Sequence, residues 1–383
     1  MTLFKHVAHR RLLLGASAAF AVALVAQTPV DRAGAATPKA QTWDAAAAAH
    51  YLDTRLAWWR QWPKAQRTND TMCVSCHTAL PGMLARPVLR SSLGDRTRSP
   101  AEIAMLDDVT KRVYLWNEIG PFYYDQKSGA GKTGESRGVE SVLNALFLVT
   151  RDNERGTVFG VDTKQAFAQM WALQMQTGDT KGGFPWLNFH LEPWESPTAT
   201  YWGATLAALA VARAPASYAA DPTIAPNIEA LRGYLRGGLA GQSLYSRMLI
   251  LIADSELHGI ATPEQRAAVV AELVAAQGPD GGWSLPALAP WQRVDKTPLP
   301  TTSDGYATAI GAFTLREVAH ETTSPADVAA LDKAKRWLIT HQDKTTGSIP
   351  AKSINKDRKA DTDAYLFMTD HATGIAALVL RPS

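Results

Sequence analysis

The sequence predicts an all-α protein, specifically an (α/α)6 toroid in which six inner helices are ringed by six outer helices. Two observations carry this prediction. The chain is rich in Ala, Leu and Trp and poor in β-branched segments with a period of two, which favours helices over strands. One unit also recurs, pairing an amphipathic helix with an almost wholly apolar one. Because an apolar helix must be buried and an amphipathic one covers it, such units are stable only when stacked on their neighbours.

Three copies of this unit are clear, and they occupy residues 176–211, 277–315 and 342–380. Each copy begins with a glutamine and passes through a glycine-containing turn, which carries tryptophan in the first two copies. After a loop, each ends in an apolar helix that opens at Ser, Thr or Asp, residues that cap helix N-termini.

Weaker copies complete six helix pairs in a single domain, residues 41–383. Further apolar helices are expected near residues 78–89, 138–149 and 244–253. The expected amphipathic helices are residues 43–61, 101–118, 162–176, 225–237, 263–277 and 325–341. An open α-solenoid is the alternative architecture, although six pairs in a chain of this size fit a closed ring at least as well.

The N-terminal segment, residues 1–35, is typical of an export signal. A basic region that includes Arg10 and Arg11 precedes an apolar stretch at 12–26, which is too short for a comfortable membrane span. Small residues at 33–35 suit cleavage. We therefore predict export to the periplasm; the alternative is an uncleaved signal that anchors the chain to the membrane.

The charge balance argues against a nucleic-acid partner. Residues 1–35 contain four basic side chains and one acidic one, so this segment accounts for the net charge of +3 of the whole chain. The exported protein is then close to neutral, whereas nucleic-acid binding needs a basic surface.

Cys73 and Cys76 are the only cysteines of the chain, and with His77 they form Cys-x-x-Cys-His, the pattern for covalent attachment of a c-type haem. Each thiol can bond one vinyl group of the haem, and His77 can bind the iron as the proximal ligand. A thioredoxin-like redox pair and half of a zinc site are the alternatives. The first usually follows a strand in a βαβ setting and the second needs two more such ligands, and the sequence offers neither. We therefore predict one covalent haem c.

The haem motif stands where the other units begin their inner helices, which predicts a haem at the mouth of the toroid. His371 is the candidate sixth iron ligand, because the repeat places it at the same mouth; a capping residue in a polar rim is its alternative role. His190, a methionine or an open sixth site are further alternatives. Arg60, in a Trp-rich segment before the motif, is a candidate partner for a haem propionate or else part of a packing cluster.

Residues 277–283, Gln-Gly-Pro-Asp-Gly-Gly-Trp, match the Gln-x-x-x-Gly-x-Trp repeat of the squalene–hopene cyclases, with weaker copies at Gln176 and Gln342. The chain resembles the squalene cyclase and prenyltransferase superfamily of toroids over most of residues 41–383. The resemblance implies the fold more firmly than an activity, because only one copy of the repeat motif is intact. A haem motif within such a toroid also resembles a group of exported bacterial proteins.

Two departures from the cyclases bear on activity. The chain has no room for their second large domain, and their Asp-x-Asp-Asp-Thr acid motif aligns with residues 304–308, where only Asp304 and Thr308 match. Residues 361–364, Asp-Thr-Asp-Ala, match this acid motif only in part. A strong carboxylic acid needs a tuning neighbour, so cyclisation by protonation is not expected. Zinc-binding prenyltransferase relatives use Asp, Cys and His, and both cysteines here are assigned to haem.

These observations favour an exported haem protein with a redox role. The first hypothesis is that it oxidises or binds an apolar, isoprenoid-like ligand beside the haem, as a haem-dependent oxidoreductase if it is an enzyme. The second is a periplasmic electron carrier or haem-based binding protein that meets a periplasmic redox partner. The third is a squalene or terpene cyclase with a structural haem. The sequence leaves the first two open, because cavity shape decides the ligand.

Overall fold

The computed structural model describes residues 41–156, 159–319 and 324–382, which gather into one compact unit. The predicted export signal, residues 1–35, lies outside the described residues. None of the helices described is both long enough and apolar enough to cross a membrane.

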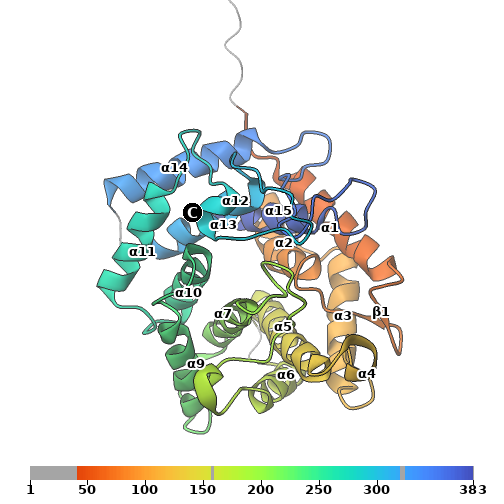
Figure 1. Ribbon diagram of the computed structural model, residues 1–383. Coiled ribbons are helices and arrows are strands. Elements are labelled where there is room, and N and C mark those ends of the chain that lie inside the picture. The colour runs from red at the N-terminus through yellow and green to blue at the C-terminus, as the bar shows by residue number, and fades with distance from the viewer. Residues whose placement is uncertain (1–40, 157–158, 320–323, 383) are drawn as a thin grey trace, which may run out of the picture. The chain divides into compact units, whose positions relative to one another are not determined.

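Six inner helices form a closed ring, as predicted (Figure 1). They are α2 (Ala79–Leu93), α5 (Lys132–Glu154), α7 (Ala199–Ala212), α10 (Leu244–Leu257), α13 (Gly305–Val318) and α15 (Phe367–Val379). Consecutive inner helices pack against each other, and α2 packs against both α5 and α15. This last pair of contacts distinguishes the closed toroid from an open solenoid.

Six amphipathic helices surround this ring. They are α1 (Ala45–Gln61), α3 (Pro100–Tyr114), α6 (Val161–Ala172), α9 (Ala225–Gly237), α11 (Pro263–Ala275) and α14 (Pro325–Thr340). Each packs on at least one inner helix. Three of them begin with a capping box followed by proline, at Ser99, Thr262 and Ser324, which explains their sharp starts.

The structure also contains short elements that the sequence did not predict. They are the strands β1 (Gln66–Arg67) and β2 (Thr71–Met72), the short helices α4 (Asp125–Ser128), α8 (Ala216–Ala219) and α12 (Leu285–Leu288), and a 3-10 turn at Gly178–Thr180. The two strands form an antiparallel hairpin in which Gln66 pairs with Met72. Apart from this hairpin, the all-α prediction is confirmed for the described residues.

A glutamine side chain joins the turn of each clear copy to an outer helix. The amide of Gln277 donates to the backbone oxygen of Gly281 at 2.9 Å and to that of Ala330 in α14 at 2.8 Å. The amide of Gln342 donates in the same way to the backbone oxygen of Asp44, at the start of α1, at 2.9 Å. The last copy is thereby bound to the first outer helix.

In the first copy this glutamine is Gln174, so the alignment of Gln176 with Gln277 was wrong. The amide of Gln174 donates to the backbone oxygens of Gly182 at 3.0 Å and Asn227 at 2.9 Å. Gln176 instead donates to the backbone oxygen of Gln174. The loop between glutamine and glycine is longer here than in the second copy, and sequence spacing alone therefore selected the wrong residue.

Replacing Gly347 with Ala is expected to weaken the closure between the last turn and α1. Gly347 has φ of +77°, and an added Cβ would lie 2.4 Å from the carbonyl carbon of Ala47. Gly241 is a matched control, because its φ is +86° and nothing lies within 4 Å of the added Cβ. We expect Gly241→Ala to cost about 1 kcal/mol and Gly347→Ala a further ~1–3 kcal/mol in urea unfolding. Equal losses would contradict this role of the contact.

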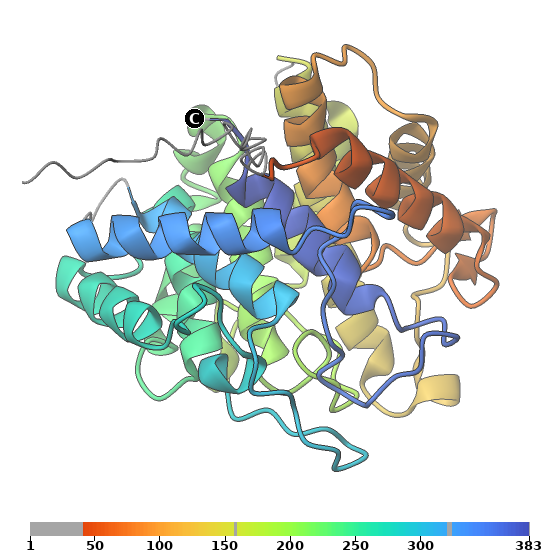
Figure 2. The same ribbon diagram turned by 90° about the horizontal axis from the view of Figure 1, so that it is seen from above.

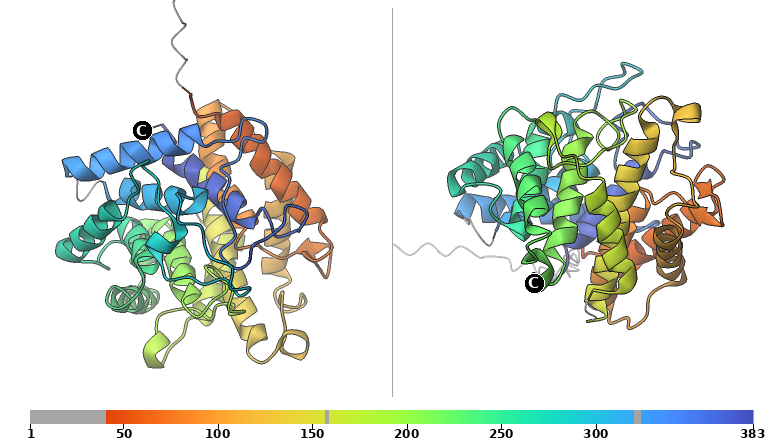
Figure 3. Two further views of the ribbon diagram at one scale, coloured as in Figure 1. Left: turned by 45° about the horizontal axis from the view of Figure 1, so that its top comes forward. Right: turned by 90° about the horizontal axis from the view of Figure 1, so that it is seen from below.

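The long connections before α13 and α15 gather at one face of the ring. Figure 2 shows this face on the side opposite the C-terminal end of the chain, and the right-hand view of Figure 3 shows the same arrangement with α4 on that face. This face corresponds to the mouth that the repeat predicts.

Candidate functional site

The motif loop, residues 73–77, lies between β2 and α2 and so directly precedes the first inner helix. The hairpin before it turns through Asn69 and Asp70, which have φ of 60° and 52°. Asn and Asp tolerate this left-handed backbone better than other residues with a side chain. After the hairpin, the N–H of Cys73 donates to the backbone oxygen of Ala65 at 2.8 Å. The hairpin therefore sets where the motif loop begins.

Ser75 folds the motif loop into the first turn that leads to α2. Its Oγ accepts the backbone N–H groups of His77 at 3.1 Å and Thr78 at 2.9 Å. Its backbone oxygen accepts the N–H of Leu80 at 3.1 Å. A serine hydroxyl placed in this way satisfies N–H groups that have no partner inside the helix.

Two side chains hold the backbone oxygens of the motif cysteines. The indole Nε1 of Trp59 donates to the oxygen of Cys73 at 2.8 Å, and Nε2 of His371 contacts the oxygen of Cys76 at 2.7 Å. His371 is buried, stacks on Trp194 with 4.2 Å between ring centroids, and does not line the cavity described below. Burial lowers the pKa of His371 to about 3. The structure thus gives His371 a positioning role and does not place it as a sixth iron ligand.

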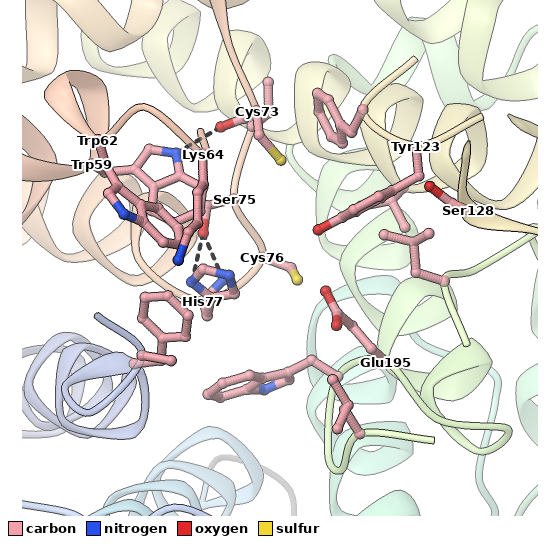
Figure 4. Close-up of a pocket in the computed structure, with 18 of the residues that line it drawn as sticks. Trp59, Trp62, Lys64, Cys73, Ser75, Cys76, His77, Tyr123, Ser128 and Glu195 are labelled. Carbon is pink, nitrogen blue, oxygen red and sulfur yellow. Dashed lines mark hydrogen bonds between the residues drawn. The ribbon is translucent and has the colours of Figure 1, made fainter. Parts of the chain in front are cut away.

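A cavity of about 1080 Å³ opens in front of the motif loop. Its volume slightly exceeds the ~300–1,000 Å³ common for small-molecule and cofactor sites. The lining comes mainly from the connections that precede α2, α5, α7 and α15, with Trp59 added from α1, which confirms that these inner-helix starts share one mouth. Figure 4 shows the sulfur atoms of Cys73 and Cys76 pointing into this space.

The thiols have neither the environment of a redox pair nor that of a zinc site. Both are free, and burial raises the pKa of Cys73 to about 12 and that of Cys76 well above its ordinary value. Disulfide exchange needs a thiolate with a lowered pKa. Within the described residues, no group of three or more His, Cys, Asp or Glu side chains could hold a metal ion. Neither alternative interpretation of the motif therefore gains support.

His77 lines the cavity between two aromatic side chains. Its ring stacks on Phe367 at 3.8 Å and meets the edge of Trp59 at 4.8 Å, measured between centroids. Nδ1 lies 2.9 Å from the hydroxyl of Ser75 and 3.3 Å from that of Thr78. For Nε2, the structure shows no hydrogen-bond partner among the residues it describes. Burial lowers the pKa of His77 well below its ordinary value, so the imidazole is neutral, as a metal ligand must be.

A buried carboxylate lies behind His77. Thr78 donates its hydroxyl hydrogen to Asp370 at 2.8 Å, so its oxygen can accept a hydrogen bond from Nδ1 of His77. Asp370 also accepts from Tyr51 at 2.7 Å and from Arg55 at 2.8 and 3.1 Å. Thr78 can therefore accept from a protonated Nδ1, which would leave Nε2 free to bind iron. The hydroxyl of Ser75, whose oxygen already accepts two N–H groups, is instead placed to donate to an unprotonated Nδ1 at 2.9 Å.

The basic side chains that line the cavity do not include Arg60, the residue predicted to meet a haem propionate. Arg60 is half-exposed, pairs with Asp108 at 2.9 Å and does not line the cavity. The basic residues that do line it are Lys64, Arg67, Lys127 and Arg358. Arg358 has no ion-pair partner among the described residues. These four side chains, rather than Arg60, are placed where haem propionates could be neutralised.

Glu195 is a cavity residue that the sequence did not reveal. Its backbone is held by two hydrogen bonds with Leu191, each 2.9 Å long. Its carboxylate faces the sulfur of Cys76 (Figure 4). Burial raises the pKa of Glu195 to about 7. An acidic residue in a Trp-rich loop carries no pattern that could have identified it.

The tryptophans of the clear copies serve mostly as packing residues. Trp186 and Trp283 are buried, and their indole groups donate to the backbone oxygens of Trp194 at 2.9 Å and Leu273 at 2.8 Å. Trp194 lines the cavity as well. Two of these residues therefore pack within the repeat, and the third also lines the cavity.

Asp304, which aligns with the acid motif of the cyclases, caps α13. One oxygen accepts the N–H groups of Tyr306 at 2.8 Å and Ala307 at 3.3 Å, and the other accepts that of Lys352 at 2.8 Å. The side chain does not line the cavity. Both oxygens thus have structural roles.

No protein-family model and no curated protein matches the sequence. Among solved structures, an ent-copalyl diphosphate synthase from Streptomyces platensis is similar at 15% identity and a TM-score of 0.46, over 79% of this chain and 51% of that chain. The type II terpene cyclase MstE from Scytonema is similar at 14% identity and a TM-score of 0.45, over 88% and 99%. A glycosidase is similar at 13% identity and a TM-score of 0.48, over 88% and 98%. This chain thus spans about half the length of the synthase, and the different chemistries of these proteins do not specify its activity.

Proposed function

We propose that this protein is an exported c-type haem protein with a redox role, in which Cys73 and Cys76 carry the haem through thioether bonds and His77 binds the iron. One observation carries the proposal: the only two thiols of the chain and a histidine with a free Nε2 line the same cavity. The adjacent spacing in the sequence agrees with this assignment.

The residues present fit a haem. The cavity is large enough for a cofactor, the imidazole is neutral, and basic side chains at the lining can meet two propionates. When bound, the haem supplies a one-electron redox couple. The protein's part is to orient His77 through Ser75 and Thr78, and to shield its ring between Phe367 and Trp59.

The ligand or partner is the finer part of the proposal. Aromatic side chains of Trp194, Tyr123 and Phe367 line the cavity, which suits an apolar, isoprenoid-like molecule beside the haem. The alternative is a periplasmic carrier or haem-based binding protein, for which a redox partner would be the only substrate. A stable six-coordinate haem that binds no added ligand would favour the carrier.

A protonating cyclase is not favoured by the geometry. Asp304 is fully engaged in capping α13 and lies outside the cavity lining. Glu195 does reach the cavity, but a carboxyl with a pKa of about 7 is a weak acid. Protonation of an alkene requires a much stronger one.

A pyridine haemochrome assay on protein made with a cytochrome c maturation system tests the proposal. We expect haem that stays attached after denaturation in the wild type, and none in the double variant Cys73→Ala with Cys76→Ala. Arg60→Ala is the matched control and should keep its haem, since Arg60 does not reach the cavity. A wild-type protein that releases all its haem on denaturation, or never binds any, would contradict the proposal.

A further inference from the structure

Several polar side chains line the cavity without a hydrogen-bond partner in the described part of the chain, and two of them lie on the same wall (Figure 4). They are the carboxylate of Glu195 and the hydroxyl of Tyr123, and neither makes a side-chain hydrogen bond to any residue that the structure describes. Figure 4 shows Cys76 between His77 on one side and Glu195 on the other, with the hydroxyl of Tyr123 directed into the same space. Removing such groups from bulk water costs stability unless they meet something in the cavity. This wall of the cavity is therefore equipped for polar chemistry.

The backbone holds both side chains in place. The backbone of Glu195 forms two hydrogen bonds of 2.9 Å with the backbone of Leu191. The backbone oxygen of Glu195 also accepts the N–H of Phe189 at 2.8 Å. The ring of Phe189 packs edge-on against Tyr123, with 5.0 Å between centroids. The backbone N–H of Tyr123 donates to Ser136 at 3.1 Å. A side chain anchored in this way points into the cavity in the absence of any ligand.

We propose that Glu195 is a proton-exchanging residue, which couples a redox change in this cavity to the uptake of a proton. The inference rests on the proposed function and deepens it. When a haem is bound, one electron from a one-electron donor protein would reduce it, and the donor would be oxidised. One proton from a solvent acid would convert the carboxylate of Glu195 to the carboxylic acid; an O–H bond of the solvent acid breaks as the O–H bond on Glu195 forms. The added negative charge favours the neutral acid, because like charges in a poorly solvated space repel each other strongly.

The groups around Glu195 allow its carboxyl group to take up and release a proton near neutral pH. The titratable and charged residues that line the cavity with it are Cys73, Cys76, His77, Tyr123, Tyr124, Glu192, Lys64, Arg67, Lys127 and Arg358. Burial alone raises the pKa of Glu195 to about 7, and no basic residue counteracts it. Glu192, the other carboxyl of the same loop, is instead hydrogen-bonded to Ser196 at 2.8 Å. Glu192 is therefore a matched control.

Redox titrations of the haem-loaded protein test the inference. We expect the midpoint potential of the wild type to fall as pH rises from about 5 to 9, by at most ~59 mV for each tenfold change in proton concentration. The midpoint of Glu195→Gln should stay constant over this range, and Glu192→Gln should follow the wild type. A Glu195→Gln protein with the pH dependence of the wild type would overturn the inference. So would a changed coordination spectrum in that variant, since Glu195 would then be an iron ligand.

The outcomes separate this inference from the proposed function. Circular dichroism checks that each variant folds; should Glu195→Gln fail to fold, Glu195→Asp replaces it, and its pH-dependent step should move along the pH axis. An unmoved step in Glu195→Asp would overturn the inference. Loss of haem from the wild type would refute the proposed function, whereas a pH-independent midpoint in haem-loaded wild type refutes only the role of Glu195.

Discussion

Replacing Asp370 with Ala is expected to lower the free energy of unfolding by about 3–5 kcal/mol. Asp370 is completely buried and accepts hydrogen bonds from Tyr51, Arg55 and Thr78. The substitution leaves the guanidinium of Arg55, which is itself buried, without its carboxylate. An unpaired buried charge is far more costly than the loss of a hydrogen bond between neutral groups. Urea unfolding of the two proteins measures the difference.

An exposed ion pair supplies the control for Asp370. Lys64 and Asp363 lie 3.1 Å apart with side chains that are 73% and 45% exposed. Because water screens such a pair, Asp363→Ala is expected to cost less than ~1 kcal/mol. If Asp370→Ala cost no more than Asp363→Ala, the buried network would not be the anchor of α15 to α1 that its contacts describe.

The ring could be predicted because its evidence is spread along the whole chain. An inner helix such as α10 is apolar on nearly every side, and its expected start at residue 244 is where the helix begins. The starts of the outer helices could be predicted from capping residues followed by proline, such as Ser324 and Pro325. Each unit repeats these signals, so errors in one copy are corrected by the others. The misplaced glutamine of the first copy did not alter the predicted fold.

The site could be predicted only where its residues are neighbours in the sequence. Cys73, Cys76 and His77 form one contiguous pattern, whereas Glu195 and Arg358 reach the same cavity from loops far along the chain. No period or spacing links such loops to the motif. The closure of the ring brings them together, because it places the start of α15 beside the start of α2.

The two less local site predictions had different outcomes. The repeat correctly brought His371 to the motif loop, but its Nε2 is engaged with the backbone oxygen of Cys76. Arg60 lies close to the motif in sequence, yet it is near the end of α1, where its side chain meets Asp108 of α3. Position in a helix can be inferred from a repeat, whereas the direction of one side chain depends on its packed neighbours.

Replacing Arg112 with Met is expected to cost about 3–5 kcal/mol and to disturb the cavity. Arg112 is fully buried in α3 and binds Glu140 of α5 at 2.5 Å. It also donates to the hydroxyl of Thr71 in β2 at 2.9 Å and to the backbone oxygen of Gly120 at 3.1 Å. These two contacts support the strand before Cys73 and the loop that carries Tyr123. Thermal unfolding and haem content of the variant measure both effects.

A second substitution distinguishes the cost of the buried Glu140 charge from the cost of losing the contacts of Arg112 with Thr71 and Gly120. Glu140→Gln in the Arg112→Met background neutralises a buried carboxylate that has lost one of its two arginine partners, and we expect it to recover part of the loss. Recovery should be incomplete, because Thr71 and Gly120 still lack their donor. Arg137, which lies 3.2 Å from Glu140 in the wild type, would also lose its carboxylate partner. No recovery at all would mean that packing at α3, rather than the buried charge, dominates the cost. Asp363→Ala, which breaks the exposed pair with Lys64, should cost less than ~1 kcal/mol in the same assay.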